Sequence, residues 1–353
     1  MKKVIGILLI LLLIGVSSSR AQDISRVGTS AAQFLKLGVG ARAAALGEAA
    51  VTFSSNVTGL YWNPASIASI DRTSIAVSRN ELYANLSYNF IGFVQPLGAS
   101  SAFGVSAIYL DSGDIEITTL DDPDGTGSFF SWEAYCLGLS YSRFVTDRLR
   151  IGGTIKYVRE GAGAFHQSAQ TIAIDIGSLL DTGVLGLKLG MCLSNFGGQM
   201  QLGGAGLEVT DYDRYPTSEG NIDNSAYLKM ENYPLPLIFR MGLSTQLVGT
   251  EGQLMNSDKS TMTIAVDAYD PNDALLRSNL GIEYQWNNIF SLRAGYRGIS
   301  VEEDEYETYN TASYTFGGGL KYDFNFARVE FDYAFTDFKV LGSGHLFSIV
   351  LAF

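Results

Sequence analysis

Cysteine and histidine are nearly missing from this chain. Its 353 residues include two cysteines, Cys136 and Cys192, and two histidines, His166 and His345. Two cysteines are too few for a disulfide scaffold or a four-cysteine zinc site. Basic residues are also scarce, since 24 Lys and Arg face 36 Asp and Glu and leave a net charge of −12. A general nucleic-acid-binding protein needs a basic face to neutralise phosphates, so that class is excluded.

Long apolar runs are also lacking, apart from one at the start of the chain. Lys2 and Lys3 precede an apolar run over residues 4–16, and Ser19-Arg20-Ala21 offers a small-x-small cleavage site. This order is typical of a secretory signal peptide, whereas the run is short for a membrane anchor. We therefore predict that residues 1–21 are a signal peptide and that the protein is exported. Its removal takes away three bases and no acid, which leaves a net charge of −15.

The rest of the chain shows a pattern with a period of two. Val329, Phe331, Tyr333 and Phe335, for example, alternate with polar residues, as in a strand with one apolar face. Fourteen such stretches begin near Thr73, Leu86, Ser100, Ser128, Arg148, Ser168, Val184, Tyr233, Ser260, Leu276, Ile289, Thr311, Phe326 and Ser343. An even number of strands suits a closed antiparallel barrel. A soluble β-sandwich would also alternate, with its apolar face turned inward.

Three features favour a membrane barrel over a soluble sandwich. The apolar faces end in aromatic residues, as in the girdles at the two membrane interfaces; these are Tyr88, Phe90, Tyr135, Tyr141, Tyr284, Trp286, Phe347 and Phe353. The last strand closes on Phe353, which we expect to act as the signal that outer-membrane barrel-assembly machinery reads. Short connections alternate with long ones at residues 111–127, 197–232 and 299–310. We therefore predict an all-β fold, a transmembrane antiparallel β-barrel of about 14 strands over residues 72–353, located in the bacterial outer membrane.

Residues 22–71 lack this alternation and are rich in Ala and Gly. Ser30 is placed to cap a short helix over residues 31–37, and a second helix is expected over residues 41–51. Small side chains suit helices that pack tightly inside a larger structure, and the lumen of a fourteen-stranded barrel has room for a plug. We predict a short helical N-terminal plug. A mobile periplasmic leader is the alternative, although disordered leaders are rarely this apolar.

Three segments resemble the PorV/PorQ family, whose barrels belong to the FadL-like outer-membrane superfamily. They are the run from Gly28 to Ala68, with GARAAALGEA and YWNPASIA, and the distal stretches GIEYQWNNIFSLRAGYR and VEFDYAFTDFKVLGSGHLFSIVLAF. Within the first segment, Asn63-Pro64-Ala65 resembles the NPA motif of the superfamily.

The resemblance implies a fourteen-stranded barrel with an N-terminal segment inside it and a non-enzymatic role in type IX secretion. In that pathway such a barrel escorts proteins that carry a C-terminal sorting domain, together with a large translocon barrel and a surface sortase-like protease. FadL-like relatives imply the alternative, a channel for hydrophobic small molecules. A channel would need an apolar pocket in the lumen and a lateral opening at a kinked strand. Glycines at 152–153, 197–198 and 317–319 are candidate kinks.

Candidate chemistry is sparse, and we expect no catalytic residue and no cofactor. By the parity of the strands, charged side chains face the lumen, where they pair with one another and anchor the plug or, alternatively, line a conduit for a solute. These are Lys156, Asp175, Lys188, Arg240, Asp267, Glu283, Arg293, Arg297, Lys321, Asp323, Arg328, Glu330 and Asp332. Asp121, Asp122 and Asp124 form a weak calcium candidate, although a solvated acidic loop explains them better. His345 is expected on the lipid-facing side, without a catalytic partner.

The negative charge is concentrated in the three long connections. They hold 17 acidic and two basic residues, a net charge of −15 that equals the charge of the whole mature chain. The rest of the barrel and the plug are therefore formally neutral. All three connections fall on the outward side of the predicted barrel. We expect an acidic outer rim that meets divalent cations or a basic surface of a partner protein.

Overall fold

The computed structural model describes residues 27–53, 56–209, 226–250, 252–300 and 312–353. The predicted signal peptide lies outside these residues, as do parts of two of the predicted long connections, residues 210–225 and 301–310. No helix among the described residues is both long enough and apolar enough to cross a bilayer.

Fourteen long strands form one closed antiparallel ring, which confirms the predicted barrel. Each strand pairs with its neighbour in the chain, β9 pairs with β14 across the longest connection, and β1 pairs with β21 to close the ring. Their bounds are β1 Ser74–Glu81, β2 Ser87–Pro96, β3 Ser101–Asp111, β6 Glu133–Phe144, β7 Leu149–Ala162, β8 Gln167–Asp181, β9 Lys188–Gly197, β14 Ile238–Gly249, β16 Ser260–Pro271, β17 Arg277–Trp286, β18 Phe290–Ser300, β19 Ser313–Asp323, β20 Arg328–Asp337 and β21 Ser343–Ala352. Every strand begins within five residues of the predicted position.

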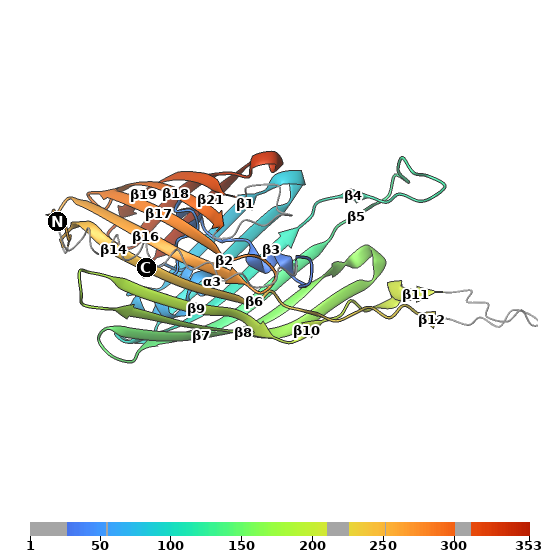
Figure 1. Ribbon diagram of the computed structural model, residues 1–353, viewed down its shortest axis with the longest axis horizontal. Helices are drawn as coiled ribbons and strands as arrows, with labels where there is room; N and C mark the ends of the chain where they lie inside the picture. Colours follow the sequence, from blue (N-terminus) through green and yellow to red (C-terminus); the bar gives the residue numbers. More distant parts are fainter. Residues whose placement is uncertain (1–26, 54–55, 210–225, 251, 301–311) are drawn as a thin grey trace, which may run out of the picture.

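The two ends of the barrel differ. Short turns and the C-terminus lie at one end, whereas two β-ribbons project from the other (Figure 1). The ribbons are made of short strands: β4 Ile115–Glu116 with β5 Phe129–Phe130, β10 Gln199–Met200 with β13 Tyr233–Pro234, and β11 Glu208–Val209 with β12 Ala226–Tyr227. One further short strand, β15 Met255–Asn256, runs parallel to the end of β14. In outer-membrane barrels short turns face the periplasm and long loops face outward, so the ribbons mark the extracellular end.

Aromatic side chains form two belts on the outer surface. Near the short turns they include Phe103, Tyr141, Trp286, Phe290, Tyr322, Phe324 and Phe353, all exposed. Towards the ribbons Tyr135 packs beside Tyr157, and Tyr296 beside Tyr314. The prediction that Tyr88 and Phe90 belong to these outer belts was wrong. Both side chains are 2% exposed and point inward. Strand β2 is apolar on both faces, because its inner face packs against the N-terminal segment.

The N-terminal segment lies inside the barrel as a series of short turns of helix: η1 Gln33–Lys36, α2 Ala41–Ala45, α3 Gly59–Trp62 and η2 Pro64–Ser69. The predicted helices were too long. The first is a single 3₁₀ turn that Ser30 does not cap, because Ala32 stands at its N-cap in a left-handed conformation. The second ends at Ala45, and Gly47 follows with φ of 64°. A Cβ on Gly47 would lie 2.8 Å from the backbone nitrogen of Tyr296, so the barrel wall passes too close for the helix to continue.

Candidate functional site: the plugged lumen

The N-terminal segment, here called the plug (residues 27–71), spans the lumen from one wall to the other. On one side η2 contacts β3, β6, β7 and β8, and on the other α2 contacts β18, β19, β20 and β21. The first wall is apolar: Leu35, Leu60, Trp62 and Ile67 of the plug share one buried cluster with inward side chains of β1–β8. Tyr88 adds a polar anchor there, because its hydroxyl donates a hydrogen bond to the Leu37 carbonyl at 2.7 Å.

The triplet Asn63-Pro64-Ala65 lies at the centre of this contact. Asn63 is fully buried. Its Oδ1 accepts a hydrogen bond from the Ala65 nitrogen at 3.1 Å and so caps η2, which begins at Pro64. Its Nδ2 donates to two carbonyl oxygens at 3.0 Å, one on Val51 of the plug and one on Ser178 of β8. One side chain therefore ties together two parts of the plug and the barrel wall.

Glycines in the wall make room for this triplet. A Cβ on Gly152 of β7 would lie 2.6 Å from the Pro64 carbonyl carbon, and a Cβ on Gly177 of β8 would lie 2.2 Å from Asn63 Oδ1. The two glycines are paired across β7 and β8. Gly152–Gly153 is thus not a kink, since β7 remains paired with both neighbours through it. The nearby irregularity lies instead at β8 and β9, where the register shifts between Ile174 and Ile176.

The opposite wall carries the charges. Glu283 of β17 is held by two arginines: Arg42 of the plug, with Nη2 2.7 Å from Oε2, and Arg293 of β18, with Nε 3.0 Å from Oε1. Arg293 also pairs with Asp332 of β20 and, at 3.8 Å, with Glu330. The Glu283, Arg293 and Asp332 side chains are at most 3% exposed. Buried charges must be paired or hydrogen-bonded to be tolerated, and here the plug supplies one of the partners.

Arg240 of β14 lies between the two walls in an aromatic cage. Its guanidinium carbon is 5.2 Å from the ring centre of Tyr61 and 5.4 Å from those of Trp62 and Tyr269. It also donates to Ser194 Oγ at 3.0 Å. Asp267 of β16, on the neighbouring strand, accepts a hydrogen bond from the Val51 nitrogen at 2.9 Å. Both groups therefore contact the plug.

Two further ion pairs fasten the plug at the extracellular end. Lys36 Nζ lies 3.0 Å from Asp273 Oδ2, in the connection between β16 and β17, and Arg297 Nη1 of β18 lies 2.9 Å from Glu48 Oε1. Gln33 Nε2 also donates to Asp273 at 2.8 Å. Burial disfavours the charged form of Asp273, but the hydrogen bonds from Gln33 and Lys36 outweigh it and hold the pKa of this carboxyl below its usual range.

Other charges assigned to the lumen pair within the barrel wall itself. Arg328 of β20 pairs with Asp323 of β19 at 2.6 Å, and their side chains are 31% and 54% exposed. Lys321 is half-buried on the same strand as Asp323. On β7 to β9, Lys156 pairs with Asp175 at 2.7 Å, and both are buried.

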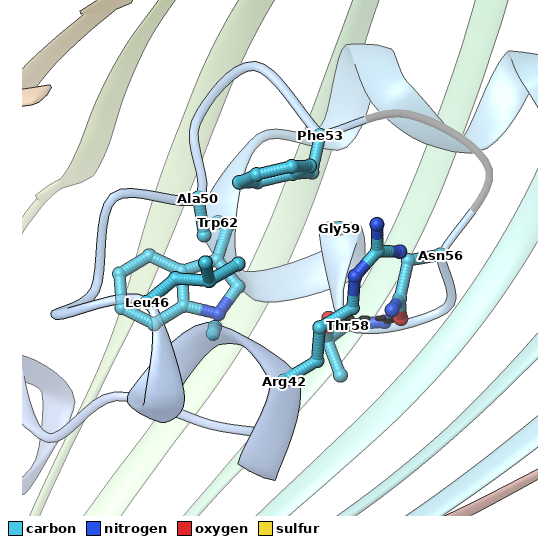
Figure 2. Close-up of a pocket in the computed structure, with 9 residues that line it drawn as sticks. Arg42, Leu46, Ala50, Phe53, Asn56, Thr58, Gly59 and Trp62 are labelled. Carbon is cyan, nitrogen blue, oxygen red and sulfur yellow. Dashed lines mark hydrogen bonds between the residues drawn. The ribbon is translucent and has the colours of Figure 1, made fainter. Parts of the chain in front are cut away.

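Cavities lie in and around the described part of the plug. Within it, Arg42, Phe53, Trp62 and neighbouring residues enclose about 10 Å³. Thr58 and Asn56 both line this pocket (Figure 2). The nitrogen and the hydroxyl of Thr58 each donate a hydrogen bond of 2.9 Å to Asn56 Oδ1. At the extracellular end a vestibule of about 630 Å³ is lined by charged residues such as Lys36 and Arg297 and equally by apolar ones such as Leu37, Leu82 and Phe338. At the periplasmic end about 210 Å³ is lined mostly by hydroxyl, amide and charged side chains.

The ribbons combine acidic and apolar side chains at the extracellular end. In the connection from β3 to β6, Asp121, Asp122 and Asp124 are exposed beside Leu120, which is fully exposed, and Phe129, which is 55% exposed. On the second ribbon Tyr227 is 66% and Leu228 59% exposed. Within the described residues, no three His, Cys, Asp or Glu side chains, the three aspartates included, gather as a metal site.

The remaining candidate residues lie apart from the plug or serve as packing. His345 is exposed on the outer face of β21, and its Nδ1 lies 2.9 Å from the Tyr333 hydroxyl. Cys136 and Cys192 are buried free thiols. Phe353 is exposed beside the last strand, and its nitrogen donates to the Thr73 carbonyl at 2.9 Å. Sequence reasoning missed the roles of Arg42, Tyr61 and Asp273, because each depends on how the plug docks rather than on strand parity.

Comparison with known proteins gives one family match. Residues 19–208 match the family model described as "Type IX secretion system protein PorV". No curated protein sequence matches the chain.

Solved structures show the same fold at low sequence identity. The CymD monoaromatic hydrocarbon channel aligns with a TM-score of 0.57 and 14% identity over 90% of this chain and 98% of its own. A Pseudomonas aeruginosa FadL homologue gives 0.54 and 12%, over 89% and 98%. The Pseudomonas putida toluene transporter TodX gives 0.54 and 15%, over 89% and 97%.

Proposed function

This chain belongs to the PorV family of type IX secretion system proteins and is an outer-membrane barrel with a FadL-like fold, and from that premise we propose that it is a non-enzymatic component of protein secretion or surface display. In this role it binds partner proteins at its extracellular end, through the acidic ribbons. Its partners would be a large translocon barrel and cargo proteins with a C-terminal sorting domain.

The observation that carries this proposal is the apolar surface of the ribbons. Leu120, Phe129, Tyr227 and Leu228 are exposed on segments that project beyond the barrel (Figure 1). Because they stand outside the zone that lipid covers, exposed apolar side chains here favour contact with another protein. The acidic residues around Leu120 would steer a basic partner surface and make the first encounter sensitive to salt.

The lumen supports the same assignment. The pocket enclosed within the plug measures about 10 Å³, which is too small for a hydrocarbon substrate. The periplasmic cavity is lined mostly by polar and charged groups, whereas the vestibule mixes charged side chains with apolar ones. The plug is tied to the wall on both sides. The similarity to the solved hydrocarbon channels is one of fold. Uptake of hydrophobic molecules through the barrel remains the alternative function that the experiment below also tests.

Affinity capture of the tagged full-length protein from outer membranes tests the proposal. We expect recovery of a large barrel and of secreted chains that share a C-terminal domain, with yields that fall as salt rises. Leu120→Ser should reduce recovery several-fold. The matched control is Leu97→Ser, which alters a leucine that is 52% exposed in the short turn between β2 and β3 at the periplasmic end. Recovery of neither class, together with lost growth of a deletion strain on fatty acids or aromatics, would favour the channel instead.

A further inference from the structure

The outer wall of the barrel carries one hollow that the proposed secretion role does not use. It measures about 570 Å³ and lies over β6, β7, β8 and β9, with Phe239 of β14 at its edge. Its lining includes Tyr141, Ile151, Ile176 and Leu193, all of which point outward. It therefore opens towards the bilayer and not towards the lumen.

The hollow exists because two outward positions carry almost no side chain. Gly153 of β7 stands between Tyr141 of β6 and Ile176 of β8 in the cross-strand register. The diagonal outward position, Ser178, faces Ile151. A Cβ on Gly153 would meet nothing closer than the Asp175 carbonyl oxygen at 3.5 Å, so the space above it is open. The large side chains of Tyr141 and Ile176 stand on either side of Gly153, so the open space above this glycine forms a groove about one side chain deep.

The groove lies at the depth of the periplasmic leaflet. Gly153 is four residues from Leu149, where β7 leaves the short turn, or roughly 13 Å along the strand. Tyr141 belongs to the aromatic belt near the short turns, which marks the membrane interface. The groove therefore faces the acyl chains of that leaflet.

One cation stands at the mouth of the groove. Arg143 lies two residues beyond Tyr141 on the same face of β6, on the periplasmic side of the belt, and it is exposed. It forms no ion pair with any residue that the structure describes. A guanidinium at headgroup depth matches the phosphate of a glycerophospholipid, since arginine binds phosphate through paired N–H donors.

We propose that this groove is a specific binding site for one periplasmic-leaflet glycerophospholipid. One acyl chain lies over Gly153 between Tyr141 and Ile176, and the phosphate binds Arg143. The occupant follows from the location of the barrel: its outer face is immersed in lipid, the groove is apolar, and its single cation sits where phosphates lie. Behind the groove, Asn63 and Pro64 of the plug lie against Gly152 and Gly177, so the lipid and the plug occupy opposite faces of the same strands.

Native mass spectrometry of the full-length protein, extracted from phosphatidylethanolamine nanodiscs into mild detergent, tests the site. We expect about one phospholipid retained per barrel, and a several-fold loss of retention in Gly153→Leu and in Arg143→Gln. Gly318→Leu is the matched control, because Gly318 of β19 also points outward and its Cβ would meet only a backbone oxygen at 3.5 Å. Arg72→Gln, an exposed arginine next to β1 at the same end, controls for lost charge.

A second measurement does not depend on the variants. A phosphatidylethanolamine with a photoreactive acyl chain, reconstituted with the wild-type protein, should label peptides of β7 and β8 several-fold more than those of β19. Equal retention in Gly153→Leu and wild type, or labelling spread evenly over the outer wall, would overturn the proposal. A protein chain cross-linked at Tyr141 in place of lipid would overturn it as well.

Discussion

Asn63 occupies the space that a side chain on Gly177 would need. A Cβ on Gly177 would lie 2.2 Å from Asn63 Oδ1, well inside any van der Waals contact. The buried amide of Asn63 therefore fits against strand β8 only because residue 177 is a glycine.

The first prediction concerns that contact. Gly177→Ala should push Asn63 away from its partners and destabilise the barrel by about 2 kcal/mol, the usual cost of an overpacked site. Denaturant unfolding in detergent micelles measures the change. Gly153→Ala, which alters the residue next to Gly152 on the outward face of β7, should stay within about 0.5 kcal/mol of wild type. Equal effects of the two substitutions would show that the plug does not dock as described.

The second prediction concerns Asn63 itself. Asn63→Asp keeps the size and the Oδ1 cap of η2 but removes the two N–H donors to Val51 and Ser178. Leaving buried carbonyls unpaired costs about 1–3 kcal/mol. We expect the loss in thermal unfolding, together with faster proteolysis of the plug while the barrel remains intact. An unchanged proteolysis rate would contradict the anchoring role.

The third prediction concerns the buried charges. Glu283→Gln leaves Arg42 and Arg293 with a weaker shared partner, and removing one member of a buried ion pair costs about 3 kcal/mol. Arg42→Met in the same background should then have a much smaller effect than it has in wild type. A double-mutant cycle measures this coupling. The exposed pair of Asp323 and Arg328 is the control, and Arg328→Met should cost less than about 1 kcal/mol.

The fourth prediction is a pH dependence. The pKa of Asp273 is lowered in the folded protein, so its contribution to stability is present above the unfolded pKa, about 3.9, and is lost as the pH falls through the folded value. Attachment of the plug at Lys36 should therefore be constant from neutral pH down to about pH 4 and weaken only below it. Protease access to the plug reports the change. Asp273→Asn should show at neutral pH the access that wild type shows only in acid, whereas Asp337→Asn, in the same vestibule, should not.

The barrel could be predicted from the sequence because its signal is local. In β20, Val329, Phe331, Tyr333 and Phe335 alternate with polar residues, and the lipid-facing and lumen-facing sides differ in chemistry. The side chains of Glu283 and Arg293 were placed in the lumen for the same reason. The prediction for strand β2 was wrong because both faces of this strand are apolar. The alternation of residues alone therefore does not say which face Tyr88 occupies. The predicted plug has to pack on an apolar part of the wall, but the sequence does not say which strands supply it.

The plug was predictable as an element but not in detail. Its helical turns are four to six residues long, too short for a hydrophobic period to show. Their ends are set by the wall, as at Gly47, where the strands β17 and β18 pass within contact distance. Ion pairs such as that of Lys36 with Asp273 join residues 237 positions apart and follow only from the docked position.

The route by which the ring closes also follows from the place of the plug in the chain. Only four residues separate the end of η2 at Ser69 from the start of β1 at Ser74, and β1 is the strand that pairs with β21. The first strand therefore cannot reach the last without drawing the plug to the barrel mouth. During biogenesis the barrel wall therefore has to close around the plug, which is the N-terminal part of the same chain. A mutation that misfolds the plug should leave β1 and β21 unpaired and the chain stalled on its assembly machinery.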